Sequence, residues 1–155
     1  MRKAEREIKG FEEIVQLVGR CDTIRLGLLD DGAPYIVPLS FGYEVENGKI
    51  ALFFHGALEG RKVGLIARNP RVCVEGDLCH GFVDNGRGGI TCDYESFIGY
   101  GDCVCVSGDE ALKGIALLMA HCGHPEFTCP PQVMAITAVY KIVLDEVAGK
   151  RRFPR

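Results

Sequence analysis

The sequence predicts a mainly β protein whose strands close into a small barrel or split barrel with a few peripheral helices. About six segments of the 155-residue chain alternate apolar with polar or small residues, which is the period of a β-strand. Helical patterns are confined to the ends of the chain and to one crossover, and glycines interrupt the longest strand pattern, as barrel corners require. Periodicity alone leaves the strand order open.

The length predicts one domain, residues 1–155, that is large enough to bury its own core. Apolar residues at helical spacing predict helices over 3–19, 61–68 and 110–121. Alternating patterns predict strands over 23–29, 34–43, 49–55, 71–76, 91–107 and 133–147, and continuation of the fourth strand past Asp77 is left open. Gly99 and Gly101 predict a bend or bulge in the long strand, and residues 129–131 are expected to form a rigid linker.

The chain from Pro34 to Lys62 is the stretch around which the other elements are organised. Its first strand places alternate apolar side chains on one face, namely Tyr35, Val37, Leu39, Phe41 and Tyr43. Pro38 has no N–H to donate, so this strand is expected at a sheet edge or a bulge. Asn47-Gly48 then predicts a tight hairpin, because both residues tolerate positive φ.

The second strand ends in small residues that are followed by two cations, in the segment His55-Gly56-Ala57-Leu58-Glu59-Gly60-Arg61-Lys62. Small residues allow close approach to the backbone, and a helix is expected to begin near Arg61. Unpaired N–H groups and basic side chains at a helix start favour an anion. A solvated pair of cations is the competing interpretation, although cations are disfavoured at helix N-termini.

Three segments resemble the flavin-binding segments of the pyridoxamine-phosphate-oxidase-like split-barrel flavoproteins, and more closely the nitroimidazole-resistance (Nim-type) branch. They are Val-Pro-Leu-Ser-Phe-Gly-Tyr at 37–43, Phe-Phe-His-Gly-Ala at 53–57 and Glu-Gly-Arg-Lys at 59–62. The resemblance extends from the N-terminal helix to Lys150. It implies a six-stranded Greek-key split β-barrel that pairs as a twofold homodimer, with flavin mononucleotide (FMN) at the interface.

The resemblance also implies a role for each segment. Arg61 and Lys62 would hold the phosphate and Gly60 would permit its approach, while His55, Gly56 and Ala57 would border the ribityl chain or ring. The flavin ring would lie against the backbone of Val37, Pro38, Leu39 and Ser40. Tyr94, Ser96, Phe97 and Ile98 match the segment that reaches the flavin of the opposite subunit; plain strand packing is their alternative. His55 is the candidate catalytic residue, although it could equally pack against the cofactor.

Composition excludes several classes of partner and compartment. A net charge of −3 provides no general attraction to nucleic acid or anionic membranes. No segment reaches the roughly 18 consecutive apolar residues of a membrane span. The charged N-terminus is unlike a signal peptide, so we expect a cytoplasmic protein. The eight cysteines are therefore expected as reduced thiols, and their spacing with the histidines fits no standard zinc pattern, so no metal is predicted.

The expected function is an FMN-dependent oxidoreductase that reduces small nitroaromatic or related acceptors, as the Nim-type resemblance implies. The flavin would carry the electrons while the protein binds and orients it. Two alternatives remain open: a flavin-binding protein that transfers electrons without catalysing a reaction, and a haem-binding split-barrel protein with a histidine ligand.

Overall fold

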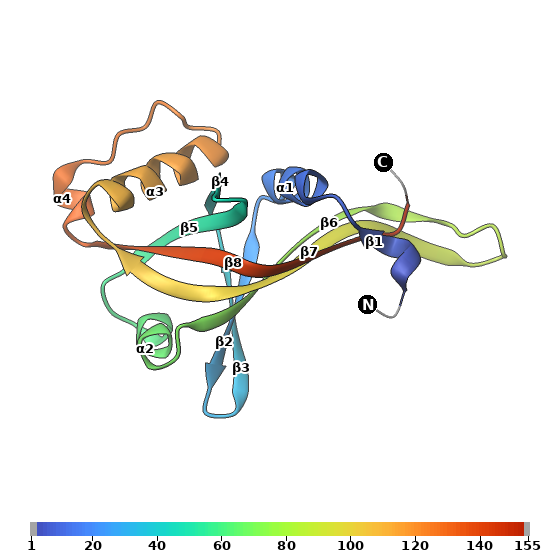
Figure 1. Cartoon of the computed structure of the whole chain (residues 1–155), viewed down its shortest axis with the longest axis horizontal. Coiled ribbons are helices and arrows are strands. Elements are labelled where there is room, and N and C mark those ends of the chain that lie inside the picture. Colours follow the sequence, from blue (N-terminus) through green and yellow to red (C-terminus); the bar gives the residue numbers. More distant parts are fainter. Residues whose placement is uncertain (1–2, 154–155) are drawn as a thin grey trace.

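One antiparallel sheet of eight strands forms the frame of the computed structural model, which describes residues 3–153 (Figure 1). The two residues at each end of the expected domain 1–155 lie outside the described residues. The strands are β1 Glu7–Ile8, β2 Ile24–Asp30, β3 Ala33–Leu39, β4 Gly42–Glu46, β5 Lys49–Ala57, β6 Arg71–Asp84, β7 Ile90–Val106 and β8 Thr137–Arg151. The helices are a 3-10 turn Ala4–Arg6, α1 Phe11–Arg20, α2 Arg61–Arg68, α3 Gly108–His121 and α4 Pro131–Met134. The mainly β prediction is confirmed.

The strand count differs from the expected six because the expected strand 34–43 is two strands and because β1 was not expected. The order in the sheet is β3-β2-β6-β7-β8-β5-β4, with β1 paired to β8. Thus β3 and β4 lie at opposite ends of the sheet although only Ser40 and Phe41 separate them in the chain. The sheet must therefore curl until its two ends meet at this link, which is consistent with a split barrel.

Packing at this link explains the break. The Phe41 ring is fully buried and lies 4.6 Å from the His121 ring, measured between centroids. A Cβ atom on Gly42 would lie 2.2 Å from the backbone nitrogen of Leu118 in α3. The chain can press against α3 here only because residue 42 has no side chain.

The first helix is shorter than the expected 3–19 and begins at Phe11. Residues before Gly10 instead form the 3-10 turn and β1, where Ile8 is buried opposite Gly149 of β8. In α1 the residues Ile14, Leu17 and Val18 face the core. The expected linker 129–131 leads directly into the one-turn helix α4, which proline can start because its missing N–H would be unpaired there.

Strands β6 and β7 pair along nearly their whole length and form a long arm that extends away from the barrel (Figure 1). β6 continues eight residues past the expected end at Gly76, to Asp84. The predicted irregularity near Gly99 and Gly101 is confirmed as a register shift between Tyr100 and Gly101. A Cβ on Gly101 would lie 2.3 Å from the Val143 carbonyl oxygen, so the strands approach too closely there for any other residue.

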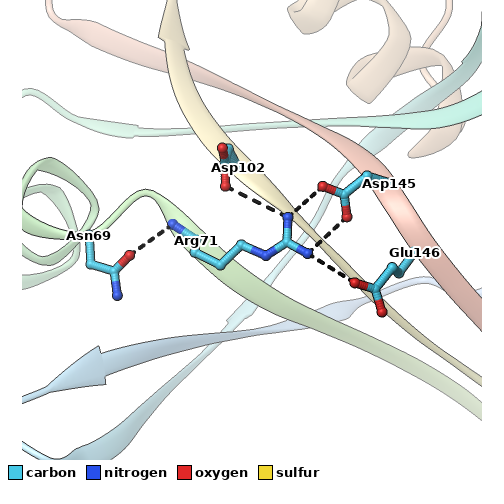
Figure 2. Close-up of polar contacts among 5 residues, drawn as sticks. All are labelled: Asn69, Arg71, Asp102, Asp145 and Glu146. Carbon is cyan, nitrogen blue, oxygen red and sulfur yellow. Dashed lines mark hydrogen bonds and ion pairs between the residues drawn. The ribbon is translucent and has the colours of Figure 1, made fainter.

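Arg71, at the start of β6, ties that strand to β8 across β7, as Figure 2 shows. Its guanidinium donates to both carboxylate oxygens of Asp145, one at 2.9 Å, and it also lies 3.4 Å from Glu146 and 3.8 Å from Asp102. Its backbone N–H donates to the Asn69 side chain at 3.1 Å.

None of the helices within residues 3–153 is long and apolar enough to cross a lipid bilayer.

Candidate functional site

Helix α2 begins as the sequence predicts, at Arg61, and its N-terminus carries no acidic cap. Gly60 precedes it with φ 131° and ψ 172°, a conformation that is essentially restricted to glycine. The Gly60 carbonyl accepts the first helical bond from Gly64 N–H at 3.1 Å. No side chain within residues 3–153 caps the helix, and its first turn holds no acidic residue. The first N–H groups are therefore available to an anion.

Arg61 lies beside this helix start but has a protein partner. Its Nε donates to Asp30 at 2.8 Å, and a terminal amino group donates to the same carboxylate. The guanidinium also lies 4.5 Å from the centroid of the Tyr35 ring in β3. Part of the Arg61 charge is therefore compensated by Asp30 at the end of β2.

Lys62 lies partly buried against β5. Its Nζ is 5.0 Å from the centroid of the Phe54 ring, and a Cβ on Gly56 would approach that Nζ to 3.0 Å. Burial lowers the pKa of Lys62, because the ammonium group is partly removed from water. No carboxylate within residues 3–153 forms an ion pair with it. An anion bound here would supply the missing counter-charge.

The structure therefore brings Gly56, Gly60, Arg61 and Lys62 together at the start of one helix. Ala57 ends β5 nearby in the chain and is exposed. Sequence analysis did not identify Asp30, Tyr35 or Phe54 as neighbours of the two cations. Asp30 lies 31 residues before Arg61, and a partner that distant cannot be assigned from local pattern.

β3 lies at one end of the strand order, so the edge position expected from Pro38 is confirmed. Tyr35, Val37 and Leu39 pack against the core, whereas Ile36 and Pro38 point outward and Ser40 is exposed. Because β2 is the only sheet neighbour of β3 among the described residues, backbone groups on its other edge are open to a ligand.

His55 points away from the two cations. Neighbouring strand residues face opposite sides, and Phe54 and Gly56 face Lys62. The imidazole instead lines a small cavity of about 120 Å³ with apolar residues of α3 and the segment before β8, together with Cys129 and Thr137. The structure thus separates the candidate catalytic residue from the candidate phosphate site within one protomer.

The predicted residues of β7 divide between the two faces of the sheet. Tyr94, Ser96 and Ile98 lie on the outer face, whereas Phe97 is fully buried in the core. The Phe97 side chain therefore packs in the core, which is the alternative of plain strand packing. Cys103 of β7 interacts electrostatically with Lys62, and at about 3.3 Å per residue these residues lie roughly 15–30 Å from Cys103 along the strand. Only another protomer could bring them to the cations.

A cleft of about 640 Å³ lies on this outer face, across β3, β2, β6 and β7. Its walls include Leu29, Ile36, Cys73 and Tyr100, and the paired guanidiniums of Arg25 and Arg71 are also in its lining. Leu29, Ile36 and Tyr100 are each more than two-fifths exposed, and Ile98 lies exposed alongside. So much exposed apolar surface in one region is typical of an interaction surface.

The fold is a mainly β sheet that is consistent with a split barrel, and the start of α2 is a candidate anion site beside it. The model of the pyridoxamine 5'-phosphate oxidase family matches residues 11–151, and the chain belongs to this family. No curated protein matches the chain.

Solved structures support the same fold. A candidate 5-nitroimidazole antibiotic resistance protein from Bacteroides thetaiotaomicron is 26% identical over 93% of this chain and 85% of its own, with a TM-score of 0.84. A FAD and heme binding protein from Mycobacterium smegmatis is 18% identical over 96% of this chain and 74% of its own, with a TM-score of 0.80. The flavocytochrome Anf3 from Azotobacter vinelandii is 17% identical over 99% and 72%, with a TM-score of 0.78.

Proposed function

We propose that the protein is an FMN-dependent oxidoreductase that reduces small nitroaromatic or related acceptors in the cytoplasm. The observation that carries the proposal is the start of α2, where uncapped N–H groups adjoin a half-buried ammonium that has no carboxylate partner within residues 3–153. A phosphate dianion suits this set of donors. The resemblance to the nitroimidazole-resistance branch supports the choice of acceptor.

In this proposal Lys62, the first N–H groups of α2 and the free edge of the Arg61 guanidinium hold the phosphate. Glycine at positions 56 and 60 leaves space beside them. The edge of β3 around Pro38 offers backbone groups to the ring. When bound, the flavin supplies the electron transfer, and the protein binds it, orients it and limits its contact with water.

We further propose that two copies pair through the outer face of β3, β2, β6 and β7. Burying Leu29, Ile36, Ile98 and Tyr100 would remove a large exposed apolar surface from water. Such pairing would also bring Tyr94, Ser96 and Ile98 of one protomer toward Arg61 and Lys62 of the other. Within one protomer these residues are too far from the two cations to share a ligand with them.

The absorbance spectrum of the purified protein tests the cofactor directly. Flavin bands support the proposal, and a Soret band indicates a haem protein. A protein that shows neither band and does not bind added FMN would overturn the proposal. If flavin is present, oxidation of NADH or NADPH that depends on a nitroaromatic acceptor supports an enzyme. A flavoprotein that reacts with no acceptor would be a binding protein.

The phosphate assignment is tested with Arg61→Ala/Lys62→Ala. Loss of two charge-assisted contacts costs on the order of 3 kcal/mol, so FMN should bind at least about 100-fold more weakly. Arg68→Ala is the matched control, because Arg68 lies in the same helix and also approaches Asp30 but lies at the far end. An unchanged affinity in the double variant, with the circular dichroism of the folded protein retained, would refute the assignment.

His55 is proposed to hold or move a proton for the acceptor and not to bind the phosphate, consistent with its place on the other side of β5. His55→Gln should therefore retain FMN while turnover falls by about 100-fold or more. Full activity of this variant would show that His55 only packs in the structure and transfers no proton.

Pairing is tested with Ile98→Asp, which places a charge on the proposed interface. The expected result is a monomer in sedimentation that has lost its flavin. Val45→Asp is the control, because Val45 is similarly exposed but lies on β4 at the other end of the sheet. A wild-type protein that is already monomeric with bound flavin would contradict the shared site.

A further inference from the structure

The β6–β7 arm extends beyond the barrel (Figure 1), and two cysteine thiols meet on it. The Sγ atoms of Cys79 and Cys92 lie 3.5 Å apart. Cys79 is exposed and Cys92 is partly buried, so a small reagent in solvent can reach the pair. All eight cysteines of the chain are free thiols in the structure, and this is the only contact between two sulfur atoms among residues 3–153.

An irregularity in the backbone makes this contact possible. Cys79 lies opposite Tyr94, and Cys92 lies opposite Phe82, so regular strands would hold the two thiols diagonally apart. The register shifts between Cys79 and Gly81, where one extra residue, His80, enters β6. Gly81 has φ 135°, which suits glycine, and such bulges bend a strand and increase its twist.

A buried carboxylate holds the bulge in place. The extra residue His80 bonds through Nε2 to Glu95 at 3.1 Å, and Arg20 of α1 donates to the same carboxylate at 2.7 Å. Glu95 is almost completely buried. Because α1 and β7 thus fix His80 on the inner side of the arm, its neighbour Cys79 is directed to the outer side with Cys92.

We propose that Cys79 and Cys92 form an oxidisable dithiol, a modification site that becomes an intramolecular disulfide by exchange with a low-molecular-weight disulfide. Forming the bond needs the sulfur atoms to close from 3.5 Å to about 2.05 Å, which a change of side-chain torsion can provide. The exchange takes no electrons from flavin. Cys79 lies opposite Tyr94 on the outer face, so the reaction requires that the proposed pairing leaves this part of the arm open to solvent.

The exchange proceeds in two steps that balance. The Cys79 sulfur attacks one sulfur of the small disulfide, whose bond breaks and releases one small thiol. The Cys92 sulfur then attacks Cys79, forming the protein disulfide and releasing the second small thiol. Two electrons and two protons pass from the cysteine pair to the reagent.

The order of attack follows from exposure and from the contact between the thiols. The hydrogen bond with Cys79 raises the pKa of Cys92, with burial and nearby carboxylates acting in the same direction. Cys79 is the more exposed of the two thiols, so a reagent in solvent reaches it first and Cys79 is the first nucleophile. By contrast, burial raises the pKa of both Cys21 and Cys103 to about 12, so these thiols are expected to be inert.

The test treats the full-length protein with oxidised glutathione and measures intact mass and free thiols. In the wild type Cys79 and Cys92 should together lose two thiols and the mass of two hydrogen atoms, without a stable adduct on either residue, and a reductant should restore both thiols. Cys92→Ser should instead accumulate glutathione on Cys79, because the second step is absent. Cys79→Ser should form no intramolecular disulfide.

Cys122→Ser and Cys105→Ser are the matched controls, because both cysteines are exposed and lie away from the pair. Both should still form the disulfide. A second readout is cleavage with trypsin after Arg87, at the arm's tip between the two cysteines: the fragments should remain joined without reductant and separate with it. Wild-type protein that keeps all eight thiols free, or a Cys92→Ser variant without the Cys79 adduct, would overturn the proposal.

Discussion

Arg61 donates from Nε to the Asp30 carboxylate at 2.8 Å and thereby links the start of α2 to the end of β2. The same carboxylate accepts from Arg68, the last residue of that helix, at 3.3 Å. The Asp30 side chain is only 12% exposed, so one largely buried carboxylate forms ion pairs with arginines at both ends of α2. Asp30 thus partly neutralises the charge of Arg61, whereas no carboxylate within residues 3–153 neutralises that of Lys62.

This relationship predicts that Asp30→Asn tightens FMN binding. The carboxylate competes with the phosphate for Arg61 and repels it, so its neutralisation should improve affinity by about 1 kcal/mol, or roughly fivefold. Isothermal titration of the apoprotein with FMN measures the effect. Asp31→Asn is the control, since Asp31 is exposed and, among the described residues, forms an ion pair only with Arg68. Weaker binding by Asp30→Asn would mean that the carboxylate positions Arg61 for the ligand.

Lys62→Met is predicted to stabilise the apoprotein while weakening FMN binding by at least about tenfold. Burial lowers the pKa of Lys62 from its ordinary 10.5, so folding disfavours its charged form. Between the folded and ordinary pKa values the unfolded chain binds more protons, and stability therefore rises with pH in that window. Methionine removes the free-energy cost of burying a charged ammonium group at neutral pH, and it also removes this rise of stability with pH.

Chemical unfolding of the apoprotein at pH 7 and just below pH 10.5 checks the effect of Lys62→Met. Lys49→Met is the control, since Lys49 is exposed at the start of β5 and its replacement should leave the pH dependence unchanged. A destabilised Lys62→Met apoprotein would show that the ammonium group already has a favourable partner.

Local chemistry was sufficient to predict several elements. Asn47 and Gly48 both have positive φ at the expected hairpin turn, and α2 has the expected bounds because Gly60 and Asn69-Pro70 punctuate it. Pro38 correctly indicated an edge strand. These features depend on the residues themselves and not on a distant partner.

Features that depend on distant partners were not predictable from pattern. Tyr35 and Tyr43 belong to one uninterrupted alternation, yet β3 pairs with β2 and β4 pairs with β5. The far part of β6 lacks apolar alternation because it forms an arm with little core beneath it. For the same reason the pairing of Arg61 with Asp30 was missed, and the cavity that His55 lines with residues of α3 was not expected.

The ion pair of Arg71 with Asp145 (Figure 2) predicts a specific acid dependence of stability. The hydrogen bond from Arg71 lowers the pKa of Asp145 below its ordinary 3.8. Its stabilising contribution is therefore present above that ordinary value and is lost as pH falls through the lower folded value. Asp145→Asn should remove this loss and flatten the acid limb of a plot of unfolding free energy against pH. Asp102→Asn, whose carboxylate lies 3.8 Å from Arg71, should leave the limb steep; equal slopes in the two variants would contradict the assignment.

The glycine that starts α2 should resist replacement for a reason independent of space. No atom would contact a Cβ at Gly60 or at Gly64, but only Gly60 has positive φ, at 131°. Gly60→Ala should therefore lower the free energy of unfolding by about 1–3 kcal/mol through backbone strain. Gly64→Ala, in the same helix, should raise it by about 0.4–1 kcal/mol, since alanine favours the helix and restricts the unfolded chain. Urea unfolding of both variants measures whether the two changes in unfolding free energy have opposite signs. Two changes in the same direction would show that the backbone conformation of residue 60 does not determine where the helix starts.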